Sequence, residues 1–197
     1  MYTFADVLLG SALFAVAGGP TITMGTDEEA QLPYWQAADK HASIRLVQRL
    51  PDQSRGFFIA RGFSPAHAER VAQSCVFQTV FRNTSRDASA GALEYNLREW
   101  VVSSGGRKAG MKTREDWKAE WQALSVPQGA QIAFEWALLP TRQVYQAGDY
   151  NWGMSIFGIK PGTVFDLDLV WRQHGVTRRA RIEGMRCAPD IEAGPQG

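Results

Sequence analysis

The sequence predicts an α+β fold whose carboxyl half is an antiparallel β-sandwich or curled sheet, with about two helices packed on one face. Helix start signals occur at Ser64-Pro65 and at Thr113, whereas the carboxyl half alternates apolar and polar residues over short segments. Such alternation is the pattern of half-buried strands. Turn signals between these segments recur every ~10 to 15 residues, the spacing of an antiparallel meander rather than of βαβ units.

The chain begins with an apolar run at residues 7–17, VLLGSALFAVA. A bilayer requires roughly 20 apolar residues, so we expect no membrane span. The length of the run and the small residues Ala15 and Ala17 are typical of a signal peptide, although no Lys or Arg precedes the run and Asp6 has the opposite charge. A candidate signal peptide at residues 1–17 predicts a periplasmic or secreted protein. The alternative is a buried element of a cytoplasmic domain.

Residues 18–33 are rich in Gly, Thr and acidic residues without periodicity, which indicates a linker or extended arm. We expect a single α+β domain over residues 34–189 and a loose tail over residues 190–197. Within the domain, residues 43–50 alternate as a strand. A turn at Pro51-Asp52-Gln53 then leads to residues 56–59, which predicts an early hairpin.

Two helices are predicted from their start signals. A Ser side chain accepts hydrogen bonds from the first N–H groups of a helix, and Pro lacks an N–H at the first helical position, so Ser64-Pro65 begins a helix. The apolar stripe that follows continues past Cys75 and places it on the core face. The second helix begins at Thr113, where Asp116 completes a shorter form of the capping box.

Three segments alternate apolar and polar residues and are predicted to be strands: residues 93–102, 132–138 and 165–172. In the second of these, Ile132, Phe134, Trp136 and Leu138 are the apolar positions. The last segment carries Asp166 and Asp168 on its polar face. These carboxylates could share a site with Glu135 if the strands are neighbours, although acids on a wet strand face are common.

The two cysteines, Cys75 and Cys187, are far apart in the chain, with no Cys-x-x-Cys motif and no nearby His cluster. Their spacing makes a structural zinc site improbable. In an oxidising compartment a Cys75 to Cys187 disulfide would stabilise the fold by roughly 4 to 5 kcal/mol on the chain-entropy description. The alternative is two reduced, buried thiols.

Composition narrows the classes of function. The 197 residues contain 21 Lys and Arg against 20 Asp and Glu, a net charge of +1, which argues against nucleic acid as a partner. No phosphate-binding, nucleophile-elbow or zinc-protease motif occurs, and we predict no cofactor. The leading hypothesis is a non-enzymatic exported binding module, an accessory subunit of a periplasmic or cell-surface assembly whose partner is another protein.

A candidate binding loop lies between two glycines and contains Asp149, Tyr150, Asn151 and Trp152. An exposed Trp and Tyr beside amide and carboxylate groups could stack on a sugar and hydrogen-bond its hydroxyls, so a glycan-binding or glycan-active protein is one alternative function. The other interpretation of the loop is a β-bulge, with Trp152 turned into the core.

A second alternative function is a copper-handling protein, because thioether and imidazole groups suit that metal. The candidate ligands are His174, Met154 and Met185. No Met-x-x-Met or His-x-His spacing forces them together, and the opposing interpretation is buried methionines with a surface histidine.

Overall fold

The structure is a computed structural model that describes residues 19–191. The candidate signal peptide at residues 1–17 lies outside the described residues. The α-helices are α1 (Pro51–Ile59), α2 (Pro65–Ala72), α3 (Arg114–Ala123) and α4 (Gln128–Ala137). The strands are β1 (Thr21–Thr26), β2 (Pro33–Ala38), β3 (Ala42–Gln48), β4 (Val76–Asn83), β5 (Leu93–Asn96), β6 (Val101–Ser104), β7 (Arg107–Gly110), β8 (Arg142–Tyr145), β9 (Tyr150–Ile156), β10 (Val164–Gln173) and β11 (Val176–Arg186).

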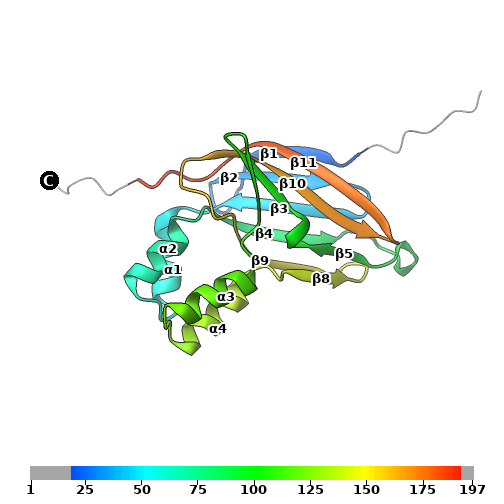
Figure 1. The fold of residues 1–197 in the computed structure, drawn as a ribbon. Coiled ribbons are helices and arrows are strands. Elements are labelled where there is room, and N and C mark those ends of the chain that lie inside the picture. Colours follow the sequence, from blue (N-terminus) through cyan, green and yellow to red (C-terminus); the bar gives the residue numbers. More distant parts are fainter. Residues whose placement is uncertain (1–18, 192–197) are drawn as a thin grey trace, which may run out of the picture.

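The strands form two antiparallel sheets, which confirms the α+β class (Figure 1). Sheet A has the order β1-β2-β3-β4-β9, and sheet B has the order β7-β6-β10-β5-β8 with β11 paired to β10. The predicted strand at residues 165–172 lies within β10, which pairs with β5, β6 and β11. The strands are not confined to the carboxyl half, because β1 to β4 build most of sheet A.

One expectation for the amino-terminal part was incomplete and another was wrong. Residues 18–33 are not only a linker or arm, because Thr21–Thr26 form β1 and pair along their whole length with β2. Most of residues 43–50 do form a strand, β3, which ends at Gln48, but its hairpin partner is the preceding β2. Residues 51–59 form α1 instead of a turn and strand, since Pro51 stands at the start of the helix and Gln53 Oε1 accepts a hydrogen bond from Leu50 N at 3.1 Å.

Both predicted helix starts are present. The Ser64 side chain accepts a hydrogen bond from His67 N, and Asp116 Oδ2 accepts one from Thr113 N at 2.8 Å. Helix α2 is shorter than its apolar stripe, because Cys75 adopts a left-handed conformation with φ of 53° and the chain continues as β4. Cys75 is buried, as the stripe predicted.

The strand predicted at residues 132–138 was wrong, since most of this segment belongs to α4. Phe134 and Ala137 are buried at helical spacing, whereas Ile132 and Trp136 point to solvent and Trp136 is 83% exposed. The same apolar residues fit both a period of two and a helix with one buried stripe. Packing against the other helices selects the helix.

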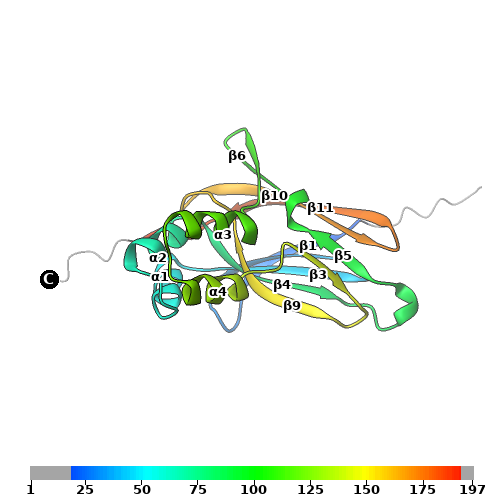
Figure 2. The same cartoon turned by 60° about the horizontal axis from the view of Figure 1, so that its bottom comes forward.

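Inward-facing residues of both sheets share one main core. A second apolar cluster joins the four helices to the adjoining ends of β4 and β9, and the helices gather at one end of the strands (Figures 1 and 2). The largest members of this second cluster are aromatic: Phe58, Phe63, Trp117, Trp121 and Phe134.

A disulfide joins Cys75 to Cys187, as predicted, with 5.3 Å between the Cα atoms. The chain after it is also held: Asp190, assigned from the sequence to a loose tail, forms an ion pair with Arg55 at 2.5 Å. The remaining tail residues 192–197 lie outside the described part. Within residues 19–191, no helix has the length and apolar character needed to cross a membrane.

Candidate functional site

The residues of the candidate loop lie on a turn and on β9, and they do not act as one group. Asp149 Oδ2 accepts a hydrogen bond from Gln146 N at 2.8 Å and thereby closes the turn. Tyr150 and Trp152 lie on one face of β9 and are 52% and 59% exposed. Asn151 is on the opposite face, because successive strand residues alternate. Trp152 therefore does not turn into the core, and that interpretation was wrong.

Tyr150 and Trp152 belong to the side of sheet A that faces away from the main core. We call this surface the outer face of sheet A and define it by seven side chains. The pairing register places Tyr150 opposite Arg82, and Trp152 opposite Val80, which in turn lies opposite Arg45. The outer face comprises Tyr34, Arg45, Val47, Val80, Arg82, Tyr150 and Trp152.

Arginines stack on the aromatic rings of the outer face. Arg82 Cζ lies 4.6 Å from the ring centroid of Tyr150, and Arg45 Cζ lies 3.5 Å from that of Tyr34. Arg45 also pairs with Asp27 at 2.9 Å. A hydrogen bond from Ala30 N, and then the contact with Arg45, hold the pKa of Asp27 below its usual value. Stacking restricts both guanidinium groups. Arg45 already donates to Asp27 and Gln36, so it is the Arg82 guanidinium whose edges are available for hydrogen bonds to a ligand.

A groove adjoins the outer face, and its cavity volume is about 710 Å³. Its floor includes Val47, Gln78 and Val80, so it is continuous with the outer face. The β1–β2 turn and α1 form its walls. Two arginines, Arg45 and Arg49, line it together with Phe57 of α1.

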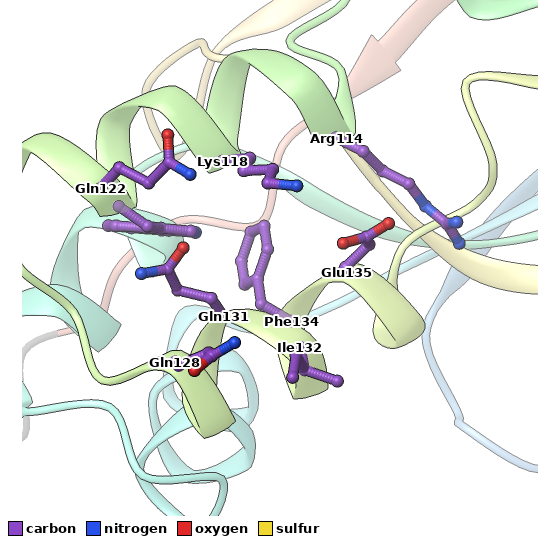
Figure 3. A pocket seen from close by; sticks show the side chains of 9 residues that line it. Arg114, Lys118, Gln122, Gln128, Gln131, Ile132, Phe134 and Glu135 are labelled. Atoms are coloured by element: carbon purple, nitrogen blue, oxygen red, sulfur yellow. The ribbon is translucent and has the colours of Figure 1, made fainter.

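A second cavity, of about 320 Å³, lies between α3 and α4 (Figure 3). Arg114 and Glu135 stand close together at one end, and burial lowers the pKa of Arg114. Three amide side chains line the rest of the cavity: Gln122, Gln128 and Gln131. Its aromatic residues, Trp121 and Phe134, are almost completely buried, so no broad aromatic surface is open to a ligand.

The candidate copper ligands do not come together. Met154 lies in the second cluster, and Met185 lies in the main core. His174 lies in the turn after β10, and its ring Nε2 is 3.1 Å from Ser89 O. Residues 19–191 contain no group of three or more His, Cys, Asp or Glu side chains placed to hold a metal ion.

The three carboxylates considered from the sequence are also separated. Arg181 binds Asp166 and Asp168, each at 2.8 Å, whereas Glu135 lies on α4. The two Asp side chains therefore already have a cationic partner and do not form an open acid pair.

Sequence reasoning found the two exposed aromatics but missed the arginines around them. One signal was present: alternation in residues 43–49 places Arg45 and Arg49 opposite to the buried Ile44 and Leu46. The pairing that brings Arg82 to Tyr150 comes from β4 and β9, which are distant in sequence. Comparison of the chain with protein-family models, with curated proteins and with solved structures found no match.

Proposed function

We propose that this protein is a non-enzymatic exported binding module that attaches to a partner protein through the outer face of sheet A. The observation that carries the proposal is the exposure of Trp152 and Tyr150 on a paired strand, beside stacked arginines. Trp, Tyr and Arg are the residue types that most often dominate protein–protein binding energy. A module of this kind would serve as an accessory subunit of a periplasmic or cell-surface assembly.

The rigid presentation of the aromatics supports the proposal. Trp152 precedes Gly153, and β9 is hydrogen-bonded on one side to β4. On the other side, Leu139 N donates to Met154 O at 3.0 Å. A backbone that is already held in a paired strand has little conformational entropy to lose on binding, which favours affinity. The disulfide supports export, because such bonds persist mainly in oxidising compartments.

The test is site-specific photo-crosslinking in the source cells, with a photoreactive amino acid at position 152 in one variant and at position 136 in another. Trp136 is a matched control, since it is an exposed tryptophan on α4 rather than on sheet A. We expect a protein partner to crosslink at position 152 and not at position 136. Trp152→Ser should lower the affinity of the recovered partner by about 30-fold or more, whereas Trp136→Ser should leave it unchanged.

Equal crosslinking at both positions, or none at position 152, would overturn the proposal. The glycan alternative gives a different result. If the tryptophan fluorescence of the wild type, but not that of Trp152→Ser, responded to a panel of sugars while no protein crosslinked at position 152, the ligand of the outer face would be a carbohydrate.

A further inference from the structure

The groove beside the outer face contains a cation without a counter-ion. Arg49 directly follows β3, and no carboxylate oxygen in residues 19–191 lies within 4.0 Å of its guanidinium. Its one side-chain partner is Gln78 Oε1, at the long distance of 3.4 Å. Arg49 Nε is buried and has no hydrogen-bond partner.

A second arginine adds positive charge at this point. Arg49 Cζ lies 5.6 Å and Arg61 Cζ lies 3.3 Å from the ring centroid of Phe57. Burial, and then the charge of Arg61, lower the pKa of Arg49. Of the acidic residues lining the groove, Asp27 is already paired with Arg45, and Glu29 is exposed. The charges that line the groove are balanced, two arginines against two carboxylates, and the excess positive charge lies at Phe57, where neither Arg49 nor Arg61 has an ion-pair partner within residues 19–191.

A partly buried cation without a counter-ion costs free energy, and an anionic ligand group would recover it. From this geometry we infer that the groove binds a carboxylate side chain of an acidic segment of the partner protein, with Arg49 as its counter-ion. This inference rests on the proposed function and identifies the chemistry of the partner.

The surroundings favour an acidic protein segment over a small anion. The cavity of about 710 Å³ is much larger than a single phosphate needs, and Val47, Val80 and Phe57 give it apolar surface beside Arg49. An extended segment could place a carboxylate at Arg49 and an apolar neighbour on this surface. The groove shares Arg45, Val47 and Val80 with the outer face, so the same partner can continue onto Trp152.

The experiment uses the full chain and two fluorescein-labelled peptides, one with alternating Glu and Val and one with Gln in place of each Glu. Binding is followed by fluorescence anisotropy at about 50 mM and about 300 mM NaCl, since screening weakens exposed charge pairs. We expect the Glu peptide to bind at least tenfold more tightly than the Gln peptide. Arg49→Gln should abolish this preference, whereas Arg107→Gln, on the exposed strand β7, should retain it.

Thermal unfolding separates a ligand-binding role for Arg49 from a structural one. Because the arginine lacks a counter-ion, Arg49→Gln should unfold at the same temperature as the wild type or higher. A markedly lower unfolding temperature, or an unchanged preference for the Glu peptide in Arg49→Gln, would overturn the inference. The inference would also be overturned if inorganic phosphate bound at Arg49 and the Glu peptide did not compete with it.

The two proposals can fail separately. If position 152 crosslinks a partner protein but Arg49→Gln binds that partner and the Glu peptide as the wild type does, the inference about the groove fails and the proposed function stands. If position 152 crosslinks nothing and the wild type shows no preference for the Glu peptide, both fail.

Discussion

The disulfide between Cys75 and Cys187 should account for a large part of the stability of the fold. The two cysteines are 112 positions apart, so the bond restricts most of the unfolded chain. On the chain-entropy description a loop of this length stabilises the native state by about 5 kcal/mol. Small domains have total stabilities of roughly 5 to 15 kcal/mol, so the double variant Cys75→Ala with Cys187→Ala should be only marginally stable.

The assay is urea unfolding at 25 °C, followed by tryptophan fluorescence. We expect the free energy of unfolding of the double variant to fall by about 4 to 5 kcal/mol. The free energy should also depend more steeply on urea concentration, because the unfolded chain without the cross-link exposes more surface. Wild type in reductant should behave in the same way, whereas the variant should be insensitive to reductant. A decrease of less than about 1 kcal/mol would refute the entropic reasoning, given the loop that the bond closes.

Three further predictions concern local packing and charge. Gly153→Ala should destabilise the fold by about 2 kcal/mol or more, because the added Cβ would lie 2.4 Å from Leu139 N, and urea unfolding measures this. Thr113→Ala should cost about 1 kcal/mol in the same assay, since it removes the hydrogen bond that Thr113 Oγ1 donates to Asp116 Oδ2 at the start of α3. Asp190→Asn should cost about 1 kcal/mol at pH 7 and less at pH 3, because its hydrogen bond with Arg55 lowers the pKa of Asp190. The stabilising effect is present above the unfolded pKa of about 4 and is lost as the pH falls through the folded value. An equal cost at both pH values would contradict the last of these.

Local chemical signals allowed parts of the fold to be predicted from the sequence. The starts of α2 and α3 depend on a few neighbouring residues, and the strand within β10 shows a clear alternation that its exposed and buried faces explain. Segments whose pattern fits two structures were predicted wrongly. In α4 the buried positions Ala130, Phe134 and Ala137 follow a helical spacing, but Ile132 and Trp136 between them are apolar and exposed, which produced a false alternation.

The candidate site could be predicted only in part, for a related reason. Tyr150 and Trp152 were conspicuous between glycines, but whether they faced solvent depended on which side of β9 the helices cover. Met154 lies under α4 in the second cluster, whereas α4 does not cover Trp152, two residues earlier. Helix α1 forms one wall of the groove around Arg49, and it was not predicted as a helix. The sequence therefore could not assign Arg49 to a groove.

The arrangement around Gly153 also bears on how a partner can attach. An edge strand commonly recruits another chain through its free backbone groups. At β9 this route is restricted, because Leu138 forms a parallel bridge with Met154 and Leu139 N binds Met154 O. The absence of a Cβ at Gly153 permits this close approach. Since the covering segment occupies the Met154 carbonyl, a partner of the kind proposed above would meet this part of β9 through side chains, and Trp152 is the largest side chain exposed on β9.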